Sequence, residues 1–196
     1  MKKIFKTSLG LLAMAGLLIL TSCGVFSLFP IYTDKTTVYF PELIGKWQQA
    51  NETTTFIEFE QYDSAKNYYR LTVTDEKEGK EILFEGRIAQ IGRDYFMDFY
   101  PICQDCFVND TYEWYYLPMH TFSKIQIGKK EMTLTDFDME KLIDLFERNR
   151  IRLRHEKVDG SILITAQANE IQKFLESYSE EESVFENPDT YHRISD

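Results

Sequence analysis

The sequence predicts a mainly β fold, namely a single antiparallel barrel or strongly curved sheet with two α-helices late in the chain. Three observations predict it. Apolar and polar residues alternate with a period of two between Gly45 and Asp136, and turn residues divide this region at hairpin spacing. Trp, Tyr and Phe make up 15% of the chain, and aromatic residues favour strands. Closure into a barrel would remove the exposed strand edges.

The strands are expected as short alternating runs separated by turns. Charged residues at 75–80 form a hairpin loop, Gly92-Arg93-Asp94 forms a turn, and 101–110 forms a longer loop. The strands predicted between these turns are 56–60, 68–74, 81–91, 95–100, 112–117, 121–127 and 131–135.

The pattern changes after residue 135. An apolar stripe at helical spacing predicts a helix over 139–148, with Asp136 or Asp138 as its N-cap. A second stripe predicts a helix over 166–178, capped by Thr165.

A short hairpin is expected between the two helices. Its strands are 151–155 and 161–164, and Asp159-Gly160 supplies the turn. The last residues, 181–196, are acidic and poor in periodic apolar positions. They are therefore predicted to form a mobile tail.

The N-terminus is typical of a secretory signal peptide over residues 1–22. Lysines precede an uncharged run at 9–20, which is shorter than the roughly 20 residues that cross a bilayer core. Leu20-Thr21-Ser22-Cys23 then resembles the bacterial lipobox, an aliphatic and two small residues before a cysteine. The resemblance implies cleavage before Cys23 and lipidation of this residue, whose acyl chains would hold the protein at a membrane.

The domain is expected at 43–180, joined to the lipid by a tether at 23–42. The tether is unusually apolar, so it either extends freely, packs on the domain or lies in the membrane interface. Gly24 follows the cysteine and the first acid is Asp34, so by analogy with other bacterial lipoproteins the signal for inner-membrane retention is absent. The predicted location is the bacterial cell envelope, on the periplasmic face of the outer membrane.

Charge limits the partners of the protein. The formal net charge is −10, and removal of the signal peptide takes away further lysines. Such a surface repels phosphate backbones, so nucleic-acid binding is disfavoured. The expected partners are the membrane, through the N-terminal lipid, and a small apolar ligand or an envelope protein. The sequence leaves the oligomeric state open.

Gly45-Lys46-Trp47, at the entry to the strand region, resembles the Gly-x-Trp signature of lipocalins. The resemblance implies an up-and-down barrel in which Trp47 plugs the closed end and a late arginine stacks on it. Arg152 and Arg154 are the candidates for that arginine. The layout from Leu43 to Phe185 also resembles lipocalin-like lipoproteins of bacterial envelopes.

Cys103 and Cys106 form the sharpest chemical motif of the domain. If Cys23 is lipidated, they are the remaining cysteines, and an oxidising compartment favours a disulfide that stiffens the loop. Redox catalysis is disfavoured, because redox-active cysteine pairs usually lie at a helix N-terminus, whereas Cys103 and Cys106 lie in the predicted loop at 101–110. The alternative is metal capture, because thiolates prefer soft ions and His120 or Met119 can join them. No resident metal or cofactor is predicted.

Some residues are candidates for contact with a ligand inside the barrel. An inward arginine can hold the carboxylate of a lipid or other small molecule, and an outward arginine paired with a surface acid is the alternative. Aromatic side chains can line a ligand site or simply fill the core. The candidates are Arg70, Arg87, Tyr95, Tyr112 and Trp114.

Two functional interpretations remain open, and an enzyme is not expected. The chain has no nucleophile elbow, no HExxH motif and no phosphate-binding glycine loop. The first interpretation is non-enzymatic binding of a small apolar or amphipathic molecule, which predicts a cavity of a few hundred Å³. The second is an inhibitor, sensor or assembly factor with a filled barrel, responsive to metal or redox state through Cys103 and Cys106.

Overall fold

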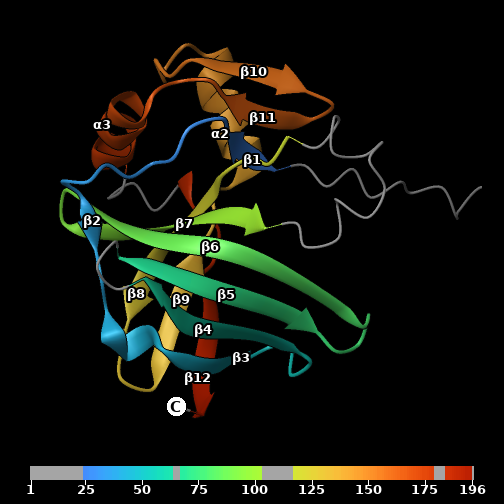
Figure 1. Ribbon diagram of the computed structural model, residues 1–196. Coiled ribbons are helices and arrows are strands. Elements are labelled where there is room, and N and C mark those ends of the chain that lie inside the picture. The colour runs from blue at the N-terminus through green and yellow to red at the C-terminus, as the bar shows by residue number, and fades with distance from the viewer. Residues whose placement is uncertain (1–23, 64–66, 103–116, 179–183, 196) are drawn as a thin grey trace, which may run out of the picture.

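Eight antiparallel strands close into a barrel in the computed structural model, which describes residues 24–63, 67–102, 117–178 and 184–195 (Figure 1). Neighbouring strands along the chain pair with one another, and β12 lies between β9 and β3 to complete the ring. The strands are β3 (Gly45–Gln49), β4 (Thr55–Asp63), β5 (Tyr68–Asp75), β6 (Lys80–Ile91), β7 (Asp94–Ile102), β8 (Thr121–Ile127), β9 (Glu131–Thr135) and β12 (Asp189–Ser195). The predicted mainly β barrel is confirmed.

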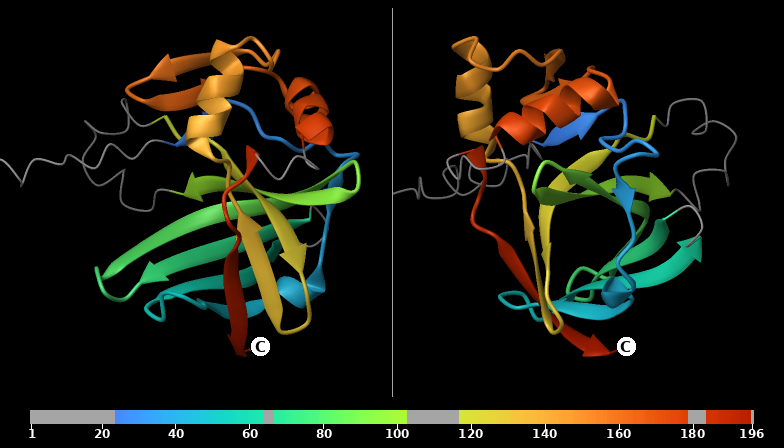
Figure 2. Two further views of the ribbon diagram at one scale, coloured as in Figure 1. Left: turned by 180° about the vertical axis from the view of Figure 1, so that it is seen from behind. Right: turned by 90° about the vertical axis from the view of Figure 1, so that its left-hand side faces the viewer.

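A second unit, which we call the cap, is inserted between β9 and β12 and covers one end of the barrel (Figures 1 and 2). It contains both predicted helices, so their expected positions late in the chain are confirmed. Its hairpin starts later than predicted, at His155. The elements are α2 (Met139–Glu147), β10 (His155–Val158), β11 (Ser161–Ile164) and α3 (Ala168–Tyr178).

The barrel wall next to the cap is buried on both faces. Successive strand residues point to opposite faces, so on β7 Phe96 packs into the cap core while Met97 packs inside the barrel. On β6, Ala89 and Ile88 divide in the same way. One sheet therefore supports two hydrophobic cores.

The N-terminal segment packs on the domain, which was one of the three arrangements left open for the tether. β1 (Val25–Ser27) pairs in parallel with β11 of the cap, and Ile31 is fully buried. β2 (Thr37–Val38) then pairs with β6, and the short 3-10 helix η1 (Pro41–Leu43) leads to β3. The apolar side chains of the N-terminal segment explain this packing, because removing apolar surface from water stabilises the folded chain.

The C-terminal residues form a barrel strand, so the predicted mobile tail is wrong for the described part, 184–195. Val184 and Phe185 are buried in the cap core, and Tyr191 of β12 is buried inside the barrel. β12 pairs with β9 and with β3. β12 was not predicted because its alternating pattern is short and is flanked by acidic residues, and because its pairing partners lie far away in the sequence.

The barrel end away from the cap is closed around Trp47. The Trp47 indole is fully buried, and its Nε1 donates to the Leu43 carbonyl at 2.8 Å. The guanidinium of Arg193 lies 4.4 Å from the ring centroid and donates to the carbonyls of Ile44 and Glu42. Gly45 has a φ of +122°, which L side chains rarely adopt.

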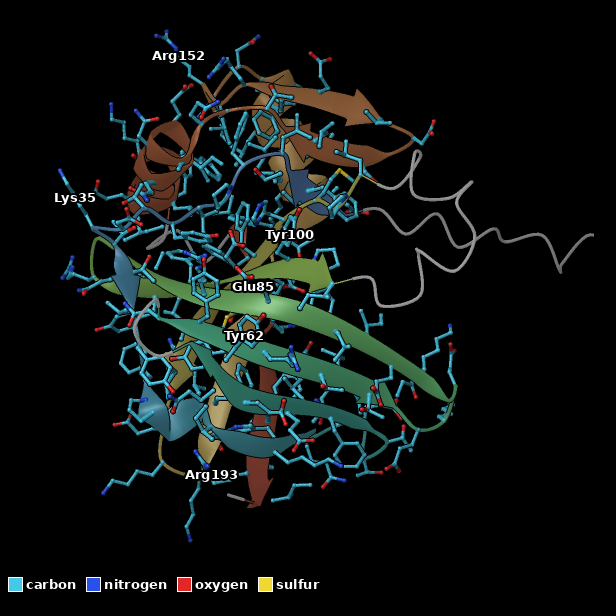
Figure 3. All side chains as sticks on the ribbon, viewed as in Figure 1. Lys35, Tyr62, Glu85, Tyr100, Arg152 and Arg193 are labelled. Atoms are coloured by element: carbon cyan, nitrogen blue, oxygen red, sulfur yellow. The ribbon has the colours of Figure 1, made fainter. Side chains whose placement is uncertain are left out.

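This arrangement is consistent with a lipocalin-like fold, but the stacking arginine was not one of the predicted candidates. Arg193 lies at the end opposite the cap, whereas Arg152 is exposed on the cap (Figure 3). Arg154 also belongs to the cap and pairs with Glu170 at 2.7 Å. The correct residue was missed because it belongs to the segment predicted to be mobile.

Candidate functional site

The half of the barrel interior nearer the cap contains a pocket of about 420 Å³. Toward the closed end, the interior is filled by fully buried side chains such as Trp47, Phe59 and Leu71. Apolar residues of seven barrel strands form the pocket wall: Ile57, Val73, Ile82, Phe84, Phe99, Phe122, Leu134 and Tyr191. The cap and the N-terminal segment complete the lining with Gly24, Val25, Phe26, Phe137 and Met139.

The strand period explains why this pocket exists. On β5, Tyr69, Leu71 and Val73 all point inward, because alternate residues share one face. The first two are fully buried in the filled half, and Val73 reaches the pocket wall. The barrel is therefore closed and packed at one end and hollow at the other.

Carboxylates lie at the mouth of this pocket. Asp136 follows β9, Asp189 begins β12, and Glu186 lies in the segment before β12. Ser123 Oγ donates to Asp136 Oδ1, and Gln49 Nε2 donates to Asp189 Oδ1 at 3.1 Å.

Two groups at the mouth of the pocket, the Asp136 carboxyl and the Tyr191 hydroxyl, have raised pKa values. Asp136 is in contact with solvent, but it lines the pocket, where the surrounding protein displaces part of its hydration. This partial desolvation raises the pKa of its carboxyl. The charge of Asp189 adds to this rise, and the hydrogen bond from Ser123 opposes it. Burial also raises the pKa of the Tyr191 hydroxyl, with further contributions from Asp189 and Asp136.

We expect Asp136→Asn to stabilise the protein at neutral pH. Because the folded-state pKa of Asp136 is raised, the folded state binds more protons than the unfolded state above the ordinary value of 3.8. This group therefore lowers stability as pH rises through that window, and asparagine, which can still accept from Ser123, removes the loss. Urea unfolding at several pH values measures the effect, with Glu58→Gln on the outer wall as control. An equal pH slope in wild type and Asp136→Asn would contradict it.

Arg70 and Arg87 lie on the outer wall of the barrel, so neither reaches the pocket. The Arg70 guanidinium lies 4.8 Å from the ring centroid of Tyr62, which is labelled on that wall in Figure 3. Arg87 lies between the rings of Tyr32 and Tyr68, at 4.3 and 3.3 Å from their centroids. It also pairs with Glu85 at 3.3 Å. This is the outward arrangement that the sequence left as the alternative.

The remaining predicted residues divide between the core and the parts of the chain that the structure does not describe. Tyr95 is half-buried near the closed end, where it packs edge-on against Phe40 with ring centroids 5.0 Å apart and lies against the barrel core, away from the pocket. The signal peptide and the strand predicted at 112–117 fall outside the described residues, except for Leu117. So do Cys23, Cys103, Cys106, Tyr112 and Trp114.

A buried Asp–His pair on the outer face of β7 was not predicted. Asp98 is only 1% exposed; its Oδ2 accepts from the Ile31 backbone N–H at 2.9 Å, and its Oδ1 lies 2.7 Å from His120 Nδ1. A carboxylate only accepts, so Nδ1 donates. The His120 ring also packs on Tyr100, with centroids 4.6 Å apart. This pair fastens the N-terminal segment to the barrel.

The metal prediction for His120 finds no support within the described ranges. No group of three or more His, Cys, Asp or Glu side chains there could hold a metal ion. The predicted Cys103 and Cys106 partners of His120 are not described, so that prediction stays open.

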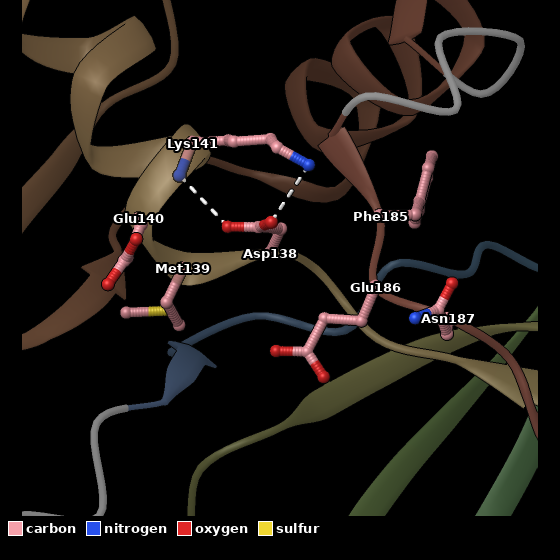
Figure 4. A pocket seen from close by; sticks show the side chains of 7 residues that line it. All are labelled: Asp138, Met139, Glu140, Lys141, Phe185, Glu186 and Asn187. Carbon is pink, nitrogen blue, oxygen red and sulfur yellow. Dashed lines mark hydrogen bonds and ion pairs between the residues drawn. The ribbon is translucent and has the colours of Figure 1, made fainter.

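A second hollow of about 520 Å³ lies at the start of α2 (Figure 4). It is lined by Asp138, Met139, Glu140, Lys141, Phe185, Glu186 and Asn187. Asp138 is already satisfied there, because its side chain accepts from the Lys141 backbone N–H at 3.0 Å and pairs with Lys141 Nζ at 2.9 Å. Most of its lining is polar and exposed, so the barrel pocket is the better candidate site.

No helix in the described residues has the length and apolar character needed to cross a membrane.

Comparison of the chain with protein-family models, with curated proteins and with solved structures finds no match. The fold and the pocket are thus the observations on which a function can be proposed.

Proposed function

We propose that the protein is a lipid-anchored envelope lipoprotein that binds a small apolar or amphipathic molecule in the barrel pocket, without catalysing a reaction. The observation that carries this proposal is the pocket of about 420 Å³ with apolar walls. Its size lies within the usual range of about 300–1,000 Å³ for small-molecule sites. A filled barrel, which the interaction-protein alternative predicted, would offer no such space.

The position of the N-terminal segment supports a membrane-linked role. Gly24, Val25 and Phe26 line the pocket, and Gly24 is bonded directly to Cys23, the proposed lipidation site. A lipid on Cys23 would therefore hold the mouth of the barrel close to the membrane surface. An apolar ligand could then pass between bilayer and pocket with little exposure to water.

Binding of the neutral fluorophore N-phenyl-1-naphthylamine tests the proposal, because its emission rises on transfer to an apolar site. The barrel and the cap are built from residues after Cys23, so the chain from Gly24 to Asp196 is used. We expect saturable binding by the wild type. In Val73→Trp, the indole fills the pocket, and binding should weaken at least about tenfold, a cost near 1.4 kcal/mol.

Thr72→Trp is the matched control, because Thr72 is the neighbour of Val73 and points to the outer face of β5. This variant should bind the fluorophore like the wild type. Equal weakening in both variants, or no saturable binding by the wild type, would overturn the proposal.

A further inference from the structure

The pocket is lined by carboxylates and by no basic side chain among the residues that the structure describes. Each carboxylate has two oxygens, and the hydrogen bonds from Ser123 and Gln49 use only one oxygen each of Asp136 and Asp189. The described ion pairs involve none of Asp136, Glu186 or Asp189. Among the described residues, the carboxylates at the mouth therefore form no ion pair with a lysine or arginine.

The basic side chains near the mouth do not line the pocket and have other partners. Lys124 pairs with Asp94 at 3.0 Å and lies 5.7 Å from the ring centroid of Phe185. Lys141, which shares a hollow with Glu186, pairs with Asp138 at 2.9 Å. Arg87 lies between two tyrosine rings on the outer wall, and Arg193 closes the opposite end. The sign of the charge at the mouth thus follows from where the fold puts each residue, in addition to the overall acidity of the chain.

Aromatic rings add a second attraction for a positive charge. Phe84 and Phe99 line the pocket with ring centroids 5.9 Å apart in an edge-to-face arrangement, and Tyr191 lines it beside Asp189. The negative face of an aromatic ring attracts cations, and quaternary ammonium groups are bound in this way. Ile57, Val73 and Leu134 offer apolar surface for an alkyl chain.

Building on the ligand binding proposed above, we infer that the pocket selects amphiphiles whose head group is positively charged, such as an alkylammonium. The acyl or alkyl chain lies along the apolar wall, and the cation lies among Asp136, Glu186 and Asp189. Anionic amphiphiles with the same chain are disfavoured by the same carboxylates. The inward arginine that would have favoured a fatty carboxylate is not part of this site.

Displacement of N-phenyl-1-naphthylamine by two amphiphiles of equal chain length tests the inference. Dodecyltrimethylammonium and dodecyl sulfate are titrated below their critical micelle concentrations, at low ionic strength. A partly hydrated ion pair contributes a factor of a few in affinity, and the anion is repelled as well, so we expect the cation to bind about tenfold more tightly. Added salt should reduce this ratio.

Asp136→Asn/Asp189→Asn should bring the ratio of the two affinities close to one, with each affinity calculated from the fluorophore affinity of the same variant. Glu58→Gln/Glu60→Gln removes the same charge from exposed positions on β4 and should keep the wild-type ratio. If the wild type binds both amphiphiles equally, or both double variants shift the ratio equally, the charge preference is wrong and pocket binding stands. If neither the fluorophore nor either amphiphile binds, the proposed function fails with it.

Discussion

Replacing Trp47 with alanine is expected to lower the free energy of unfolding by about 3–5 kcal/mol, the usual cost of truncating a fully buried aromatic side chain. Trp47 is 0% exposed, and its removal leaves a cavity at the closed end of the barrel. The Leu43 carbonyl also loses its donor at 2.8 Å, and Arg193 loses the ring on which it stacks. Urea unfolding followed by far-UV circular dichroism measures the change.

Two milder variants separate the contributions at the closed end. Trp47→Phe keeps an aromatic ring but loses the Nε1 donor, so its cost should be smaller than that of alanine. Arg193→Lys keeps the charge but loses the planar fork that reaches both the Ile44 and Glu42 carbonyls. If Trp47→Ala costs less than about 1 kcal/mol, as surface substitutions do, the closed end does not depend on this plug.

Replacing Asp98 with alanine is expected to cost about 3–5 kcal/mol, because it leaves buried polar partners without an acceptor. The Ile31 backbone N–H, in a fully buried residue, loses its bond at 2.9 Å, and His120 Nδ1 loses its bond at 2.7 Å. The N-terminal segment should also loosen, since Asp98 joins it to β7. Urea unfolding measures the cost, and faster hydrogen exchange at the Ile31 and Ser27 amides reports the loosening.

Asp94→Asn is the matched control on the same strand. Asp94 pairs with Lys124 at 3.0 Å, both side chains are partly exposed, and such pairs contribute about 1 kcal/mol or less. Asp98→Asn keeps one acceptor oxygen but turns an amide NH₂ toward the second donor, so its cost should fall between those of the other two variants. Equal costs for Asp98→Ala and Asp94→Asn would show that the buried pair does not secure the segment.

The barrel could be predicted from the sequence because its strands carry their own pattern. Alternating residues at 68–74 and 81–91 identify β5 and β6 without reference to the rest of the chain. β1 and β2 are short, and the pairing of β1, β2 and β12 depends on partners such as β11 that lie far away in the sequence. Local pattern cannot reveal such strands, since their stability comes from tertiary contacts.

The pocket could be predicted only in part, for the same reason. The sequence indicated a barrel that could hold a ligand, but Gly24, Asp189 and Tyr191 come from segments assigned to the tether and the tail. The direction of each arginine depended on strand register, which the turns alone did not fix. One available signal was missed. Asp98 shares a strand face with the aromatic residues Phe96 and Tyr100, and an acid buried among such residues needs a hydrogen-bond partner.

The place of β12 in the ring has a consequence for how the chain acquires its structure. The first barrel strand, β3, pairs with the last, and these partners lie at opposite ends of the domain, as in the pairing of Tyr191 with Gln49. The ring cannot close until β12 has been synthesised and, if the protein is exported, translocated. Contacts of such long sequence separation slow folding. Until β12 pairs, strands β3 to β9 would form an open sheet in which the edges of β3 and β9 are unpaired. Cellular factors that bind exposed strand edges would have their longest opportunity in that interval.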